Sequence, residues 1–131
     1  MNTKNIWANL AVSDLERTTK FYSELGFKPN GSSKQLTSFS IGEHNFVVHF
    51  FTKDKLRAEI KGELADLIQG NEIIFTLSAS SREEVDLSAK EVQKAGGTLV
   101  TFPGEFGEEY YGFVFADPDG HRFNVFYMEG L

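Results

Sequence analysis

A chain of 131 residues, 40% of them hydrophobic and 24% charged, is expected to fold as one globular domain with a real core rather than to stay disordered. A formal net charge of −6 argues against nucleic-acid binding, which needs a basic face, and the absence of cysteine excludes disulfides, thiol nucleophiles and thiolate metal sites. No stretch offers the ~20 apolar residues of a membrane helix, and the first residues lack the apolar segment of a signal peptide, so we expect a cytoplasmic protein that does not bind membranes.

The first half of the chain predicts a strand followed directly by a helix. Residues 5–12, NIWANLAV, alternate in character, which places Trp7 and Asn9 on one face and the aliphatic side chains between them on the other. The next residues, SDLE at 13–16, form a capping box in which the serine is the N-cap and the glutamate reaches back to it. Gly26 can end this helix in the left-handed conformation.

A hairpin and a second helix are expected before the middle of the chain. Residues 35–51, QLTSFSIGEHNFVVHFF, predict two strands that turn near Gly42. Residues 53–69 carry leucine and isoleucine at helical spacing in an otherwise charged segment, which predicts an amphipathic linker helix that ends before Gly70. His44 adjoins the hairpin turn, so we expect it in solvent.

The second half repeats the same order of elements. Residues 72–79, EIIFTLSA, alternate as a strand should, and SREE at 81–84 is a second capping box. A pair of glycines then stops the second-half helix. Residues 110–128 predict a hairpin that turns at the sequence D-P-D-G, and His121, directly after that turn, is expected in solvent.

Two motifs at opposite ends of the chain accompany this doubled plan. The first is V-x-D-L-E…F-Y…L-G-F in residues 12–27, and the second is the D-P-D-G turn at 117–120. Together they resemble the signatures of the vicinal oxygen chelate superfamily, the group of glyoxalases, bleomycin-resistance proteins and extradiol dioxygenases, over nearly the whole chain. The sequence S-R-E-E-V-D at 81–86 is similar to that of bacterial glyoxalase-related members labelled as lactoylglutathione lyase or dioxygenase homologues.

The resemblance implies an α+β fold of two βαβββ modules, in which curved mixed sheets surround a cleft and the helices lie outside. A single domain over residues 1–131 would comprise a first module at about 4–52, a linker helix at about 53–69 and a second module at about 71–129. Antibiotic-sequestering relatives pair two chains, so a homodimer is expected by analogy.

The resemblance also implies where a metal would bind. In enzymatic members, four inward-pointing His, Glu or Gln residues hold one divalent metal such as Zn, Ni, Fe or Mn. These positions carry over to Trp7, Phe50, Glu72 and Asn124. Aromatic carbon rings supply no usable lone pair and an amide oxygen is a poor ligand, so we predict no complete metal site. His49 would enter the second position if the strand register shifted by one residue, and the metal ligands would then be Glu72 and His49.

Three functions stay open on these residues. The first is a metal-free protein that binds a small molecule, with the amide of Asn124 donating to Glu72 and accepting from the ligand. The second is a glyoxalase-type lyase or isomerase that uses a divalent metal and has Glu72 as its catalytic residue. The third is a structural module whose cleft is filled by side chains. The residues expected to contact a ligand are Trp7, Asn9, Phe50, Glu72, Tyr111, Asn124 and Phe126.

Overall fold

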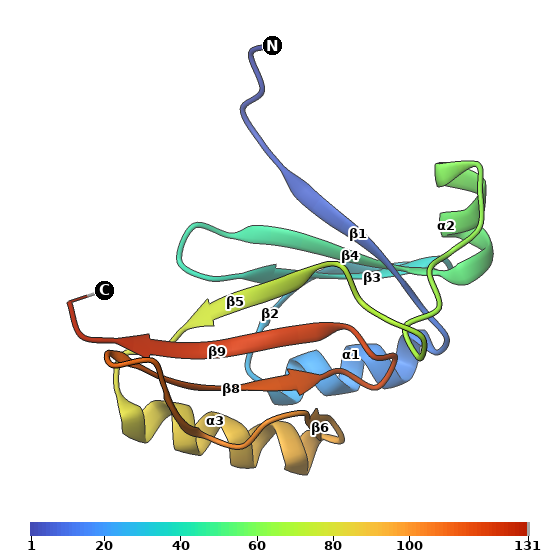
Figure 1. Cartoon of the computed structure of the whole chain (residues 1–131). Helices are drawn as coiled ribbons and strands as arrows, with labels where there is room; N and C mark the ends of the chain where they lie inside the picture. The colour runs from blue at the N-terminus through green and yellow to red at the C-terminus, as the bar shows by residue number, and fades with distance from the viewer. Residues whose placement is uncertain (131) are drawn as a thin grey trace. The chain divides into compact units, whose positions relative to one another are not determined.

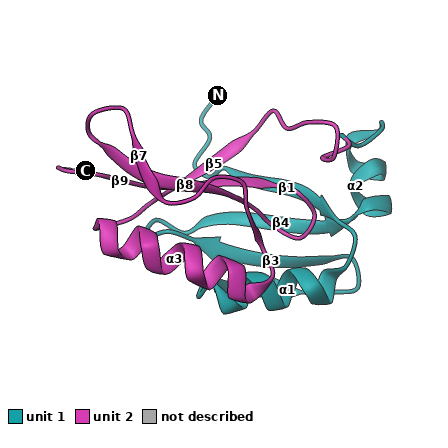
Figure 2. Cartoon of the chain, turned by 60° about the horizontal axis from the view of Figure 1, so that its bottom comes forward, with its two compact units in different colours: residues 1–65 teal, residues 66–131 magenta. Residues whose placement is uncertain are grey.

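Each half of the chain forms a sheet with its own helix. The computed structural model describes residues 1–130 (Figure 1). This part of the chain contains three helices, and its nine strands form two sheets. The chain divides into two compact units, residues 1–65 and residues 66–131 (Figure 2). No helix in the described part of the chain has the length and apolar character required to span a membrane.

Unit 1 is built on a four-stranded sheet. Its elements are β1 (Trp7–Val12), α1 (Leu15–Glu24), β2 (Lys28–Ser32), β3 (Leu36–Ile41), β4 (Phe46–Thr52) and α2 (Lys53–Ile60). The strand order is β1-β4-β3-β2. β1 runs parallel to β4, whereas β3 is antiparallel to both of its neighbours. The first strand of the unit therefore pairs with the last one.

Helix α1 packs its aromatic side chains against the sheet of unit 1. Phe21 and Tyr22 are fully buried. The ring of Tyr22 stacks on Phe50 of β4 with 4.6 Å between ring centroids, and it lies 5.8 Å from the ring of Phe39 of β3. Each ring removes a large apolar area from water, so this cluster forms the core of the unit. Side chains that alternate with the core residues along the strands point to the opposite face of the sheet.

Unit 2 repeats this plan. Its elements are β5 (Ile74–Ser78), α3 (Arg82–Ala95), β6 (Thr98–Leu99), β7 (Gly104–Phe106), β8 (Tyr110–Ala116) and β9 (Arg122–Met128). The strand order is β5-β9-β8-β6, with β7 also paired to β8. β5 runs parallel to β9, which again joins the first strand to the last. The predicted α+β class is confirmed, although α3 is followed by four strands where α1 is followed by three.

The core of unit 2 lies between α3 and the sheet. Val85 and Val92 of α3 are buried and lie on one side of the helix. On the sheet, the rings of Phe115 and Phe123 stack at 5.1 Å with an angle of 7° between their planes. Phe113 is equally buried and lies 5.9 Å from Phe115.

The two main helices begin with side-chain caps, one of them shifted from its predicted place. Asp14, not Ser13, is the N-cap of α1, and its Oδ1 accepts from the backbone N–H of Arg17 at 3.0 Å. A carboxylate at this position also favours the positive end of the helix dipole. Ser81 caps α3 as predicted, because its Oγ accepts from the backbone N–H of Glu84 at 3.0 Å.

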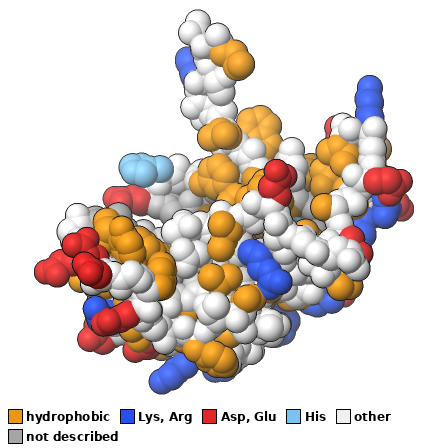
Figure 3. Space-filling model, viewed as in Figure 1, with side chains coloured by type: hydrophobic (Ala, Val, Ile, Leu, Met, Phe, Trp, Pro, Cys, Tyr) orange, Lys and Arg blue, Asp and Glu red, His pale blue; other side chains and the backbone are white. Residues whose placement is uncertain are grey.

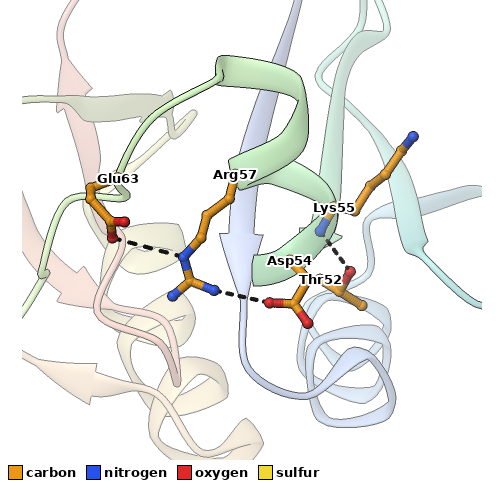
Figure 4. Close-up of polar contacts among 5 residues, drawn as sticks. All are labelled: Thr52, Asp54, Lys55, Arg57 and Glu63. Carbon is orange, nitrogen blue, oxygen red and sulfur yellow. Dashed lines mark hydrogen bonds and ion pairs between the residues drawn. The ribbon is translucent and has the colours of Figure 1, made fainter.

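Helix α2 is shorter than the predicted linker helix over residues 53–69. It ends at Ile60, because Lys61 takes the left-handed conformation with φ of 54°. The N–H of Lys61 donates to the carbonyl of Arg57 at 2.9 Å, which closes the last turn. The side chain of Arg57 lies between Asp54, at 3.0 Å, and Glu63, at 4.0 Å (Figure 4). The helix therefore spans only about two turns, and the apolar side chains beyond Ile60 do not extend it.

The turn between β8 and β9 is built on a buried carboxylate. Oδ1 of Asp117 accepts from the backbone N–H groups of Asp119 and His121 at 3.0 and 2.9 Å, and Oδ2 lies 2.8 Å from Nδ1 of His121. The expectation that His121 lies in solvent is wrong, because the side chain is needed to satisfy this buried carboxylate. His44, in the turn between β3 and β4, is exposed as expected.

Candidate functional site

One face of the unit 1 sheet gathers an indole, an amide and an imidazole. The register pairs Asn9 of β1 with His49 of β4, and Trp7 with Val47, so these side chains share a face. The rings of Trp7 and His49 meet edge to face at 6.4 Å. Trp7 is 54% exposed, which is unusual for so large an apolar ring. Here the sequence-predicted placement of Trp7 and Asn9 on one face is confirmed.

A polar chain behind His49 fixes its orientation. Nδ1 of His49 lies 2.8 Å from Oγ of Ser38 on β3, and Nδ2 of Asn30 donates to the same oxygen at 3.1 Å. Ser38 is 1% exposed, so its hydroxyl has little access to water and holds the imidazole firmly. Since Nδ1 is engaged in either tautomer, Nε2 is the ring nitrogen that can meet a ligand.

Phe50 does not belong to this face. It is fully buried, and its ring stacks on Tyr22 of α1. The register pairs Phe50 with Thr37, whose hydroxyl bonds to Thr19 of α1 at 2.8 Å. The prediction that Phe50 contacts a ligand is therefore wrong. Its neighbour His49 lies on the face that was predicted for Phe50, so the predicted register was off by one residue.

In unit 2, Asn124 and Phe126 share the face of the sheet that is turned away from α3. Asn124 lies between Thr76 of β5 and Val114 of β8 in the register. The ring of Phe126 lies 5.1 Å from that of Tyr110 and 5.9 Å from that of Phe106. The sequence did not single out Phe106 or Tyr110 for this face.

Glu72 lies apart from Asn124. It precedes β5, is exposed, and comes four residues before Thr76, the residue beside Asn124. A strand advances about 3.3 Å per residue, so an extended chain would hold Glu72 roughly 13 Å along the sheet from Asn124. The predicted hydrogen bond from Asn124 to Glu72 is not supported by this register, and Ile74 occupies the nearer position on β5.

Tyr111 faces α3 rather than Asn124. Its hydroxyl donates to Oδ1 of Asp86 at 2.6 Å, and the guanidinium carbon of Arg82 lies 4.9 Å from the centre of its ring. Arg82 also binds Glu105 of β7 with 2.7 Å between nitrogen and oxygen. Because successive side chains of a strand point to opposite faces, Tyr110 takes the side that was predicted for Tyr111.

The hydrogen bond from Tyr111 to Asp86 predicts that the Tyr111 phenol ionises at unusually high pH. The hydrogen bond to Asp86, with a smaller contribution from desolvation, raises the pKa of Tyr111 above its usual range. The stabilisation needs the phenolic proton, so it is present below the pKa of the unfolded chain and is lost as pH rises through the folded pKa. In an absorbance titration at 295 nm, Tyr111→Phe should remove a tyrosine that ionises above the usual range of a phenol. Loss of a tyrosine that titrates near 10 would contradict this.

The donor atoms of these faces do not fit a transition-metal site. Residues 1–130 contain no group of three His, Cys, Asp or Glu side chains placed to hold a metal. The face of unit 1 offers one imidazole, from His49, beside the indole of Trp7 and the amide of Asn9. An amide and an indole do not complete a set of ligands for Zn, Ni or Fe.

Ser38 and Asn30 are the residues of unit 1 that sequence reasoning missed. The signal for Ser38 was present, because Ser38 and Ser40 alternate with Phe39 and Ile41 in β3 and so mark the polar face. Asn30 lies on β2, whose pairing with β3 shifts register between Pro29 and Ser32, and no periodicity predicts that irregularity.

Comparison with known proteins places this geometry in a family. The sequence model of the Glyoxalase/Bleomycin resistance protein/Dioxygenase superfamily matches residues 6–125. A hypothetical protein from S. aureus is similar in structure with a TM-score of 0.85 and 32% identity, over 95% of this chain and 94% of that chain.

Two further solved structures show the same fold at lower identity. A glyoxalase-related enzyme from Fulvimarina pelagi has a TM-score of 0.84 at 19% identity, over 95% of this chain and 88% of that one. A lactoylglutathione lyase from Agrobacterium tumefaciens has a TM-score of 0.69 at 18% identity, over 95% and 94%. No protein of curated function matches the sequence significantly. The family match and the shared fold together establish that the chain belongs to the glyoxalase/bleomycin resistance protein/dioxygenase superfamily.

Proposed function

We propose that this chain binds a small molecule on the face of unit 1 formed by Trp7, Asn9 and His49, without a complete transition-metal site. The observation that carries the proposal is the exposed indole of Trp7 beside an imidazole whose other nitrogen is held by Ser38. A half-exposed indole leaves apolar area in water, which a bound ligand would remove.

The chemistry of this face suggests a ligand that is flat and apolar on one side and carries a hydrogen-bonding group. The indole offers a ring face for stacking, while Nε2 of His49 and the amide of Asn9 offer directed hydrogen bonds. An aromatic wall with a few convergent polar groups is typical of small-molecule sites. Of the residues predicted in unit 2, Asn124 and Phe126 remain candidates for ligand contacts there.

The single tryptophan makes a direct test possible. Because Trp7 is the only tryptophan, the fluorescence of the whole protein reports on this face. A panel of planar heterocycles and phenols should include compounds that quench or shift this emission saturably. For the best compound, affinities of the wild type and of Trp7→Leu are compared by calorimetry, and we expect a loss of about tenfold. Phe102→Leu, which alters another exposed ring, is the control and should bind normally. A panel without any saturable response, or an equal loss in the control, would refute the proposal.

The alternative function is a glyoxalase-type lyase or isomerase. It is favoured by one observation, that His49 and not Phe50 lies on the same face as Trp7 and Asn9. The remaining candidate ligand, Glu72, is exposed and precedes β5. The homodimer expected by analogy stays part of the proposal, and sedimentation at micromolar concentration tests it.

Metal content separates the two functions. Protein purified without chelator should contain far less than one transition metal per chain by plasma emission analysis. Added Ni or Zn should raise the melting temperature little. If the chain had a complete site, metal at a hundred times its Kd would stabilise the folded protein by about 2.7 kcal/mol. Asn124→Asp should not create tight binding, because no second metal-binding side chain lies beside it in the register. Stoichiometric metal that is lost in His49→Ala would establish the lyase alternative instead.

A further inference from the structure

Three aromatic rings gather at the end of the unit 2 sheet where β7 turns into β8. We call Phe106, Tyr110 and Phe126 the aromatic patch. Their ring centroids lie 5.1 to 6.0 Å apart, and the planes are tilted by 34° to 49°. Phe106 is 44% and Tyr110 37% exposed, and Phe126 is partly exposed. The patch therefore presents ring surface to solvent.

A glycine beneath the ring of Phe106 leaves room for that ring against the sheet. Gly112 pairs with Phe126 across the strands, and a Cβ placed on it would lie 3.2 Å from the ring of Phe106. The ring of Phe106 thus occupies the space above a residue that has no side chain. This packing keeps the patch in place and leaves its outer ring faces open.

Carboxylates border the aromatic patch. Glu108 and Glu109 lie in the turn between β7 and β8, and Glu129 follows Met128, the residue paired with Tyr110. All three glutamates are exposed, and within residues 1–130 none forms an ion pair. Figure 3 shows hydrophobic and acidic side chains side by side at the end of the molecule where Figure 1 places the C-terminus. The border therefore carries uncompensated negative charge.

On the other face of the same hairpin, an aromatic ring and a glutamate contact the positively charged side chain of Arg82. There the guanidinium of Arg82 lies over the ring of Tyr111 and pairs with Glu105, so one aromatic ring and one glutamate together bind a positive group. The aromatic patch repeats these components with three rings and three glutamates. No cation–π contact to its rings comes from the described part of the chain.

We propose that the aromatic patch is a second binding site and that its occupant is a small organic cation of the alkylammonium or quaternary ammonium type. Ring faces attract such a cation through their quadrupoles, and the methyl groups of the ligand cover apolar ring surface. The carboxylates at the border raise the local cation concentration and keep anions away. The site shares no residue with the face of unit 1 and takes a ligand of different charge, so it stands independently of binding at that face.

Choline and its uncharged isostere, 3,3-dimethylbutan-1-ol, test the proposal as a matched pair of probes. In amide NMR spectra, choline at millimolar concentration should shift the signals of Gly107, Gly112 and Tyr110 saturably. The isostere should shift them far less, because it has the same shape without the charge.

Variants then separate rings from charge. Tyr110→Leu keeps an apolar side chain but removes one ring, and should weaken choline binding roughly two- to fivefold. The triple variant Glu108→Gln, Glu109→Gln, Glu129→Gln keeps the shapes and should weaken binding and remove most of its dependence on salt. Phe102→Leu and Glu43→Gln change an exposed ring and an exposed glutamate elsewhere and should bind choline as the wild type does.

Several results would overturn the inference. One is equal binding of choline and its isostere, which would make the patch merely apolar. A second is choline-induced shifts that map to the face of Trp7 and leave Gly112 unmoved. A third is self-association of the free protein that Tyr110→Leu abolishes, because a second copy would then be the occupant. None of these outcomes depends on whether the unit 1 face binds its own ligand.

Discussion

Replacing Gly112 by alanine should lower the free energy of unfolding by about 3 kcal/mol, one of the largest effects expected in this chain. A Cβ on Gly112 would lie 2.2 Å from the carbonyl oxygen of Val125 on the neighbouring strand. That oxygen belongs to the backbone of the sheet, so it can move only if the pairing of β8 with β9 is disturbed. Urea unfolding followed by circular dichroism measures the loss.

Gly104 is the matched control. It lies directly opposite Gly112 in the pairing of β7 with β8, and the nearest atom to a Cβ built on it is 3.8 Å away. Gly104→Ala should therefore change the free energy of unfolding by less than about 0.5 kcal/mol, or raise it, because alanine has fewer unfolded conformations than glycine. Equal losses in both variants would show that the close approach at Gly112 does not exist in solution.

Phe50→Ala should cost about 3 to 5 kcal/mol, since it removes a fully buried ring that stacks on Tyr22. The adjacent substitution His49→Ala should cost only about 1 kcal/mol, because His49 is partly exposed and its removal leaves Ser38 with the hydrogen bond from Asn30. Both values come from the same urea experiment. The two losses of unfolding free energy thus report which face of β4 is buried. A larger loss for His49→Ala than for Phe50→Ala would indicate that Phe50 lies on the ligand face.

Features set by a few neighbouring residues were predictable from the sequence. The alternation of NIWANLAV placed Trp7 and Asn9 together, and both glycine stops, the Gly42 turn and the D-P-D-G turn lie where local rules put them. The doubled plan followed from these pieces, because each half had its own capped helix and its own hairpin. The likeness to a known superfamily then supplied the expectation that the strands form mixed sheets.

The faces of two strands were not predictable in this way. The sequence FVVHFF in β4 is apolar at nearly every position, so it lacks the alternation that would separate His49 from Phe50. Two adjacent tyrosines in β8 present the same ambiguity, and only the partner α3, with Asp86 and Arg82, decides that Tyr111 faces the helix. Register of this kind is fixed by tertiary contacts rather than by local pattern.

The predicted ends of two elements were wrong, one of them for an energetic reason. Residues 61–69 keep apolar side chains at helical spacing, yet Lys61 adopts a left-handed conformation and the helix stops. A short helix gains little from propensity alone, so the apolar spacing beyond it was not sufficient evidence. Glu72 was assigned to a strand that in fact begins at Ile74, and the register that pairs Thr76 with Asn124 keeps Glu72 away from that amide.

The parallel pairing of first with last strand in each unit sets the order in which the protein can assemble. The register joins Trp7 to Val47 in unit 1 and Ile74 to Arg122 in unit 2, with a helix and a hairpin made in between. During synthesis, β1 can pair with β4, and β5 with β9, only after almost the whole of the unit has been made. Such long loops slow folding, because closure entropy is spent before the contacts form. The hairpins and helices can form first, and the N-terminal strand of each unit is then the piece that completes it.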